Sequence, residues 1–213
     1  NKMKKLAIMG SGVGSNFETI AKYFEGKDVE ITCLSDVKDA PILEKAEKLG
    51  ISFEFLPFEE NCKYFTENKF DLVVLAGYMR ILPAEVLNLA KFINIHPSLL
   101  PSFKGKDAIK HAFLAGVKVS GVTIHWVEKG VDAGKIIAQH PVFICNSTSF
   151  GEFEEEIHET EHKLYPIVIE KILEDKVFDF QDLMKISCHN KTCGGHSSDD
   201  LNNPGGGCKG CQH

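Results

Sequence analysis

The 213-residue sequence lacks any apolar run of the roughly 18 residues that a membrane-spanning helix needs. It also lacks an excess of positive charge, because 24 Lys and Arg side chains are outnumbered by 30 Asp and Glu side chains, giving a net charge of −6. Nucleic-acid and membrane-surface binding both depend on a basic field, so neither partner is expected. No secretory leader pattern precedes the first strand-like segment, and we expect a cytoplasmic protein.

Cysteine is sparse over most of the chain, where Cys33, Cys62 and Cys145 stand singly and argue against a disulfide framework. The composition then changes to polar, Gly-rich and aperiodic from about Ser187. We therefore expect one catalytic domain over residues 3–186 and a Cys-, His- and Gly-rich tail over residues 187–213. The tail is interpreted as either flexible or metal-binding, through the C-x4-C-x14-C-x2-C pattern of Cys188, Cys193, Cys208 and Cys211. Disulfide formation there is a third alternative.

Apolar segments alternate with amphipathic ones in the first half of the chain, which is typical of βαβ units. Strands are expected over Lys4–Met9, Val29–Leu34, Ile51–Leu56, Asp71–Ala76 and Phe92–His96. The helices between them are expected over Phe17–Phe24, Pro41–Leu49 with Asp39 as its N-cap, Glu59–Asn68 and Pro83–Ala90.

The order of elements changes beyond Pro101. A helix is expected over about Asp107–Ala115, followed by two longer strands, Lys118–Val127 and Lys135–Cys145, and a final helix over about Ser149–Leu173. The predicted fold is α/β: a doubly wound, mostly parallel sheet with a Rossmann-like N-terminal half, an antiparallel strand pair and a long C-terminal helix.

The first strand leads into a glycine-rich turn, Gly10–Asn16 (GSGVGSN), that opens the first helix. Glycines let a ligand approach the backbone, and the free N–H groups at a helix N-terminus attract an anion. A dinucleotide fingerprint needs GxGxxG, but Ser15 occupies the third glycine position, although Asp36 could imitate its ribose-binding acid. A phosphate on a small substrate, held by Gly14, Ser15 and Asn16, fits the turn better. A tight turn without a ligand is the alternative.

The strand Phe92–His96 carries the most informative short pattern. Residues i and i+2 of a strand point to the same side, so Asn94 and His96 share one face, and Pro97 ends the strand directly after them. This places an amide and an imidazole at the carboxyl end of a strand, where open α/β sheets bind ligands. The pair suits oxyanion stabilisation with proton transfer. Asp132, in a turn with a glycine two residues to each side, is the candidate carboxylate partner that would favour the imidazolium. A purely structural Asn–His pair is the alternative.

Five motifs occur in an informative order and spacing: GSGVGSNF, LAGYMRIL, INIHPSLLPSF, SGVTIHWVEKGVDAGKIIAQ and ETEHKLYP. Together they resemble the phosphoribosylglycinamide formyltransferases, folate-dependent enzymes of purine (IMP) biosynthesis, over about Met3–Leu173. Methionyl-tRNA and sugar formyltransferases share the Asn–His–Asp set, but the GSN turn points to a phosphoribosyl substrate. Formyltetrahydrofolate deformylases resemble the same body but are expected to carry a regulatory domain ahead of it, so formyl hydrolysis and transfer to another amine are alternatives.

The resemblance implies how the reaction would proceed. The substrate amine would attack the formyl carbon of 10-formyltetrahydrofolate, a co-substrate, and no metal would be required. Asn94 and protonated His96 would stabilise the tetrahedral oxyanion. Asp132 would keep His96 charged and help relay the proton to the folate nitrogen.

The resemblance also implies two binding sites for small molecules. For phosphoribosylglycinamide, it points to a phosphate site and an amine-binding carboxylate, formed by Gly14, Ser15, Asn16 and Glu161. For the folate, it points to a largely backbone-lined pocket beside the catalytic amide, formed by Met79, Arg80, Ile81, Leu82 and Asn94. His125 is a secondary candidate at the site. The segment between Leu56 and Asp71 is short for this family, and Lys63 is not assigned a folate-binding role. Monomer and homodimer both stay open.

One rival motif lies in the last predicted helix, where His158 to His162 reads H-E-x-x-H, the helical pattern of zinc proteases. Pro166 follows closely, no third ligand stands out, and both histidines are expected on a solvated face. Glu161 is instead expected to point inward, where a carboxylate needs a partner. The zinc metalloprotease therefore stays a distant alternative, as does a non-catalytic folate-binding or metal-storage protein.

Overall fold

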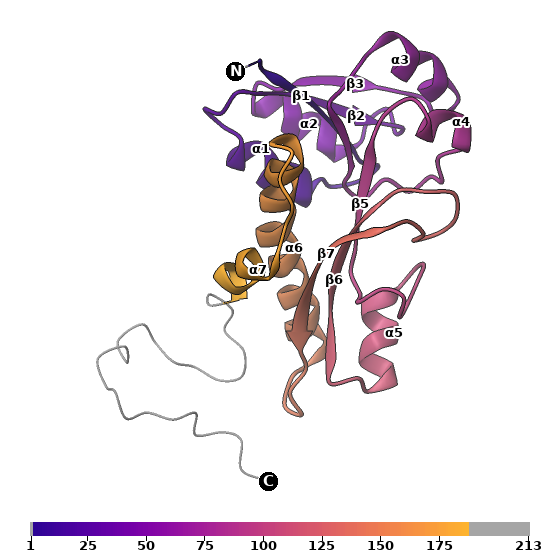
Figure 1. Ribbon diagram of the computed structural model, residues 1–213. Coiled ribbons are helices and arrows are strands. Elements are labelled where there is room, and N and C mark those ends of the chain that lie inside the picture. Colours follow the sequence, from indigo (N-terminus) through magenta and orange to yellow (C-terminus); the bar gives the residue numbers. More distant parts are fainter. Residues whose placement is uncertain (1, 188–213) are drawn as a thin grey trace.

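The computed structural model describes residues 2–187 of the chain (Figure 1). Within that range, seven strands form one sheet in the order β3-β2-β1-β4-β5-β6-β7. The strands are β1 (Lys4–Met9), β2 (Val29–Ser35), β3 (Ser52–Phe55), β4 (Leu72–Leu75), β5 (Phe92–His96), β6 (Val119–Trp126) and β7 (Ile136–Phe143). The first five pair in parallel, and β6 and β7 continue the sheet in antiparallel pairing, as the sequence predicts.

Helices cover both faces of the sheet. They are α1 (Ser15–Tyr23), α2 (Pro41–Lys48), the 3-10 turn η1 (Phe58–Glu60), α3 (Asn61–Glu67), α4 (Ala84–Leu87), α5 (Ala108–Ala115), α6 (Phe150–Leu173) and α7 (Phe180–Ser187). The core under α1, α2, α5 and α6 and the core under α3 and α4 draw alternate residues from the same strands, since successive side chains of a strand point to opposite faces. The sheet is therefore doubly wound.

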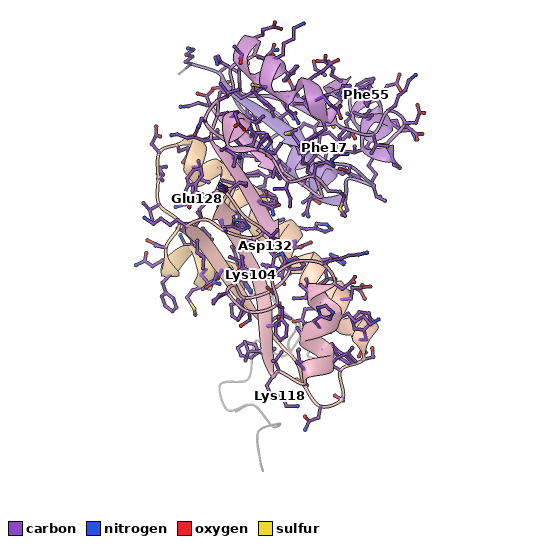
Figure 2. The ribbon with its side chains drawn as sticks, turned by 90° about the vertical axis from the view of Figure 1, so that its right-hand side faces the viewer. Phe17, Phe55, Lys104, Lys118, Glu128 and Asp132 are labelled. Carbon is purple, nitrogen blue, oxygen red and sulfur yellow. The ribbon has the colours of Figure 1, made fainter. Side chains whose placement is uncertain are left out.

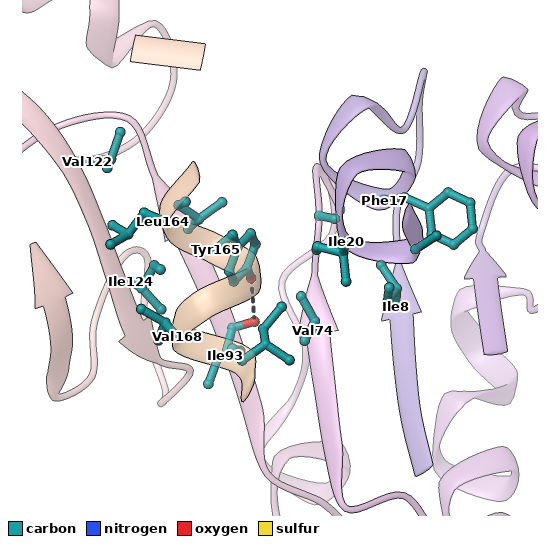
Figure 3. Close-up of a cluster of buried hydrophobic side chains, with 14 of the residues drawn as sticks. Ile8, Phe17, Ile20, Val74, Ile93, Val122, Ile124, Leu164, Tyr165 and Val168 are labelled. Carbon is teal, nitrogen blue, oxygen red and sulfur yellow. Dashed lines mark hydrogen bonds between the residues drawn. The ribbon is translucent and has the colours of Figure 1, made fainter. Parts of the chain in front are cut away.

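Helix α6 is the longest element and fixes the centre of the larger core. Ser149 caps it by accepting a hydrogen bond from the Glu152 backbone, while the Glu152 side chain accepts one from the Ser149 backbone. Its buried side is apolar except for Thr160, Glu161 and the hydroxyl of Tyr165. Tyr165 lies on this side against β4 and β5 (Figure 3). The Tyr165 hydroxyl donates hydrogen bonds to the backbone carbonyls of Leu75, 2.7 Å away, and Ile93, 3.4 Å away.

Several sequence-based boundaries are corrected by the structure. Helix α2 is capped by Ala40 rather than Asp39, with no side-chain hydrogen bond at the cap, because Pro41 already sets the first turn. Helix α4 has only four residues, and a 3-10 turn precedes α3. Helix α7 is not anticipated by the sequence reasoning, which ends its last helix at Leu173.

Two further points concern membrane-spanning helices and the cysteine-rich tail. No helix in residues 2–187 is long and apolar enough to cross a bilayer. The four cysteines predicted as a possible metal site, Cys188, Cys193, Cys208 and Cys211, lie outside the described residues.

Candidate active site

The candidate site lies at the carboxyl ends of β1, β4 and β5, which meet at one edge of the sheet because these strands are parallel. Strands β1 and β4 are neighbours, but β1 continues into α1 on one face, whereas the chain after β4 continues into α4 on the other. Such a change of face opens a crevice between the strand ends, which is where doubly wound sheets bind ligands.

The contact between His96 and Asp132 is the most buried pairing of a histidine with a carboxylate at this edge. The His96 residue is 5% exposed, and its Nδ1 lies 3.3 Å from Oδ1 of Asp132. The other ring nitrogen, Nε2, lies 2.7 Å from the carbonyl oxygen of Phe103. Both nitrogens thus face oxygens that only accept hydrogen bonds, so the doubly protonated imidazolium is the form that satisfies both contacts.

Asp132 reaches His96 from the turn between β6 and β7. Its backbone has a positive φ of 47°, a conformation that Asp and Asn tolerate better than most residues. Its second oxygen, Oδ2, accepts a hydrogen bond of 2.6 Å from the backbone N–H of Gly105. The turn requires a glycine at position 134, since a Cβ there would lie 1.8 Å from the Trp126 carbonyl oxygen. Figure 2 shows Asp132 midway along the molecule, between Phe17 and Lys118.

The chain after β5 is held against the strand end by a buried hydroxyl. Thr123 donates to the carbonyl of Ser98 at 2.7 Å and accepts from the backbone N–H of Leu100 at 3.0 Å. Gln139 adds a hydrogen bond to the same hydroxyl. These contacts fix the loop that places the Phe103 carbonyl on His96, a contact that strand and helix periodicity could not reveal.

Asn94 lies on the same face as His96, as the strand period predicts. It is half-buried, and no group in residues 2–187 forms a hydrogen bond with its side chain. Its neighbour across the sheet is His125, which is 2% exposed. The Nδ1 atom of His125 bonds the Trp126 carbonyl, while its Nε2 is buried without a hydrogen-bond partner in this part of the chain. The Asn94 amide is therefore available to a ligand, whereas the Nε2 atom of His125 is buried.

The glycine-rich turn forms the second part of the site. Gly14 caps α1 with a φ of 76°, and a Cβ at this position would lie 2.6 Å from Cγ1 of Ile42. Both facts require glycine there. The backbone N–H groups of Ser15 and Asn16 then stand in the first turn of a nine-residue helix, where the macrodipole favours an anion. The predicted phosphate-binding residues Gly14, Ser15 and Asn16 thus lie at the N-terminus of this helix.

Asn16 also brings α1 into contact with α6. Its Nδ2 lies 3.5 Å from Oε2 of Glu161, and its Oδ1 is buried without a partner in the described chain. Glu161 is 6% exposed, so the inward orientation expected from the helical period is confirmed. The same Oε2 lies 3.2 Å from Nδ1 of His158. Asn16 of the glycine-rich turn and His158 of α6 therefore both contact the Glu161 carboxylate.

The segment expected to line the folate pocket follows β4. Met79 is 74% exposed and Ile81 66% exposed, whereas Leu82 is buried. The Arg80 guanidinium lies over the Phe58 ring, with Cζ 4.4 Å from the ring centroid. The large apolar side chains of Met79 and Ile81 are thus exposed to solvent next to the buried Leu82. An exposed apolar surface of this kind suits an aromatic ligand.

The folate-pocket segment is tied to the glycine-rich turn by Ser11, a residue to which sequence reasoning gave no role. Its hydroxyl accepts a hydrogen bond from the backbone N–H of Met79 at 3.0 Å and donates one to Asp36 Oδ1 at 2.6 Å. One oxygen of the Asp36 carboxylate is therefore engaged within the protein.

The H-E-x-x-H pattern does not form a zinc-protease centre in the described chain. His158 uses Nδ1 to contact Glu161, and burial lowers the pKa of His162. No group of three or more His, Cys, Asp and Glu side chains in residues 2–187 is arranged to hold a metal ion. The expectation of two solvated histidines is right for His158, which is exposed, but His162 is only partly accessible.

Comparison with known proteins identifies a matching family and similar sequences and structures. The formyl transferase family model matches residues 4–169. The phosphoribosylglycinamide formyltransferase of Bacillus subtilis is 42% identical over 186 residues, which cover 80% of this chain and 95% of that protein. The enzyme of the same name from Haemophilus influenzae is 35% identical over 82% of this chain and 90% of its own length. The crystal structure of phosphoribosylglycinamide formyltransferase from Streptococcus pneumoniae TIGR4 superimposes with a TM-score of 0.72 at 40% identity, covering 80% of this chain and 99% of that one.

Proposed function

The chain belongs to the formyl transferase family, and we infer that it transfers a formyl group from 10-formyltetrahydrofolate to the amine of phosphoribosylglycinamide in purine biosynthesis. Family membership makes it a one-carbon group transferase that uses formyltetrahydrofolate as a co-substrate. The residues that carry out each step are our proposal, and they rest on the geometry of the strand ends.

The reaction forms one C–N bond and breaks another. The neutral amine of phosphoribosylglycinamide attacks the formyl carbon, and the carbonyl oxygen becomes a tetrahedral oxyanion. The bond from this carbon to the folate nitrogen N10 then breaks, while a proton moves from the attacking nitrogen to N10. Two demands follow: positive charge or hydrogen-bond donors for the oxyanion, and a group that handles the proton.

Asn94 and His96 meet the first demand. The Asn94 amide carries no hydrogen bond within the described chain, so it is available to donate to the oxyanion. The His96 imidazolium supplies a positive charge in a site with little solvent, where electrostatic stabilisation is strongest. For Nε2 to act, it must exchange the Phe103 carbonyl for the substrate oxygen.

Asp132 acts through His96. Its carboxylate stabilises the imidazolium, and the Gly105 N–H holds the carboxylate in place. The imidazolium can donate its Nε2 proton to N10, and the ring then takes up the proton that the attacking nitrogen loses, so that the charge of the pair is restored. The contact of Nδ1 of His96 with Oδ1 of Asp132, at the end of a strand that also presents a free amide, is the observation that carries the proposed function.

The two substrates occupy adjoining parts of the crevice in this proposal. The ribose phosphate binds the backbone of Gly14, Ser15 and Asn16, and the substrate amine lies near Glu161. The folate binds along the segment that follows β4, with its ring against the exposed side chains and its polar edge on backbone groups; that segment consists of Met79, Arg80, Ile81 and Leu82. The hydrogen bond from the Met79 N–H to the Ser11 hydroxyl fixes the glycine-rich turn and the folate-binding segment relative to each other.

Several finer features complete the proposal. Residues 3–186 form the catalytic domain, catalysis needs no metal, and the protein acts in the cytoplasm on small molecules. Monomer and homodimer are both compatible with this arrangement.

Incubation of the purified full chain with 10-formyltetrahydrofolate and a panel of acceptors tests the function. The panel contains phosphoribosylglycinamide, glycinamide without the phosphoribosyl group, and water alone, and mass spectrometry follows the products. We expect formylated phosphoribosylglycinamide to dominate, since only this acceptor fills the phosphate site. Formate released at the same rate with or without an amine would instead identify a hydrolase.

A further inference from the structure

Glu161 has a charge partner that comes from its own helix. The carboxylate is nearly buried, so it requires compensation for lost hydration. Asn16 contributes a neutral and long contact of 3.5 Å, whereas His158 contributes a potential cation at 3.2 Å. Within residues 2–187, no other basic side chain forms an ion pair with Glu161. The contact follows from helix geometry, since residues three apart are neighbours on one face.

The surroundings of His158 favour its charged form. The hydrogen bond to Glu161 raises the pKa of His158 and outweighs the opposing effect of partial burial, and Glu154 one turn earlier acts in the same direction. The next histidine along the helix behaves differently, because burial lowers the pKa of His162 and the neighbouring His158 acts in the same direction. The carboxylates of Glu161 and Glu159 on α6 and of Glu18 on α1 act in the opposite direction without reversing the shift. Of the two histidines, His158 is the one suited to balance Glu161.

The proposed function places a second cation at the same carboxylate. The amine of the substrate is an ammonium ion in acid, and only its neutral form can attack the formyl carbon. A carboxylate with no other partner would stabilise the ammonium ion and so oppose the reaction. A carboxylate already paired with an imidazolium gains less from the ammonium charge, because the two cations repel each other.

We propose that His158 is a positioning residue that balances the charge of Glu161 and thereby keeps the bound substrate amine neutral and nucleophilic. The inference rests on the proposed function, in which Glu161 receives the amine. The proton balance is simple: the ammonium ion loses one proton to solvent on binding, the imidazolium keeps its own, and the amine then enters formyl transfer as described above. The His158 side chain is half-exposed, whereas the carboxylate that it contacts is nearly buried.

The replacement His158→Gln tests the charge separately from the hydrogen bond, since a glutamine amide can donate to Glu161 but stays neutral. The matched control is His162→Gln on the same helix, which has no hydrogen bond to Glu161. The exposed position of His158 favours folding of its variants, and His158→Lys restores a permanent positive charge. The full chain is assayed with phosphoribosylglycinamide over a range of pH, with kcat and the substrate dissociation constant measured separately.

We expect kcat of His158→Gln to fall about tenfold below wild type in acid and to converge with wild type at alkaline pH, where the wild-type His158 is neutral and residue 158 carries no charge in either protein. Substrate affinity in acid should stay equal or increase, because the unbalanced carboxylate binds the ammonium ion. His158→Lys should keep the wild-type rate in acid, and His162→Gln should follow the wild-type profile.

Two results would overturn the charge-balance role: equal acid rates for wild type and His158→Gln, or a loss of rate by the same factor at every pH together with weaker binding. The second result would indicate a merely structural contact. Failure of the proposed function is a separate outcome, visible as no formylation by the wild type and by His162→Gln.

Discussion

Asp132→Asn isolates the ion pair that we place at the centre of the reaction. The aspartate uses both oxygens, one toward Nδ1 of His96 at 3.3 Å and one toward the Gly105 N–H at 2.6 Å. Asparagine has one oxygen, so it can keep only one of these contacts and must turn an NH2 group toward the other donor. The positive φ at this position suits asparagine, so the backbone of the turn should stay unchanged.

The expected loss follows from the distance and the burial. Two unit charges 3.3 Å apart interact by about 5 kcal/mol at an effective dielectric constant of about 20. Both side chains are nearly buried, and breaking such pairs costs about 3–5 kcal/mol. If most of this stabilises the imidazolium in the transition state, kcat should fall by roughly 10² to 10³. The KM of each substrate should change little, since both oxygens of Asp132 contact protein groups.

Steady-state formyl transfer to phosphoribosylglycinamide measures both parameters. Asp107→Asn is the control, since Asp107 also has a positive φ and lies on the surface. Thermal unfolding of both variants shows whether the fold is retained. A well-folded Asp132→Asn protein with kcat within about threefold of wild type would refute the reasoning, because the charge on His96 would then not need this carboxylate.

Three further predictions concern the frame of the site. Gly14→Ala should lower the free energy of unfolding by about 2 kcal/mol and weaken phosphate binding, whereas Gly12→Ala, with nothing within 4 Å of a Cβ, should do neither; urea titration compares them. Tyr165→Phe should cost about 1–2 kcal/mol in the same assay, because two strand carbonyls lose a buried donor, and an unchanged urea midpoint would contradict this. Burial raises the pKa of Cys33 to about 12, so iodoacetamide at pH 8 should modify the exposed Cys62 and leave Cys33 intact in peptide maps of folded protein; equal labelling would show that the β2 core opens.

Much of the fold can be predicted from the sequence, because strands buried on both faces are continuous apolar runs and their helices have a clear apolar side. The bounds expected for β1 and β5 agree with the structure at every residue. Local chemistry was a poorer guide at α2, where Asp39 has the right type for a cap but the chain uses Ala40 ahead of a proline. Helix α7 is short and begins after an exposed linker, so no long apolar pattern marks it.

The candidate site could likewise be predicted only in part from the sequence. The strand period places Asn94 and His96 on one face, and the helix period turns Glu161 inward, because both are local relations. The meeting of Asp132 with His96 depends on two loops brought together across the sheet, and the Phe103 and Gly105 backbone contacts depend on the same loops. Local periodicity cannot give these relations: the flanking glycines made Asp132 a candidate partner and the family resemblance supported it, but neither could show that it meets His96.

His158 shows how a correct prediction of exposure can miss a contact. The sequence reasoning placed it on a solvated face, and its side chain is indeed half-exposed. The ring still turns toward Glu161, because the carboxylate three residues later lies at the border between the buried and exposed sides of α6. Amphipathic patterns assign residues to sides, whereas contacts at the border depend on rotamers.

Transfer of an isotopically labelled formyl group from 10-formyltetrahydrofolate to phosphoribosylglycinamide, by the full wild-type chain and by a folded His96→Ala variant, tests the central claim most directly. The account predicts labelled product from the wild type and a loss of at least about 10³ in rate for the variant, since both the positive charge and the proton-handling group are removed. Normal turnover by His96→Ala would contradict it, because the reaction would then not depend on the imidazole at the end of β5.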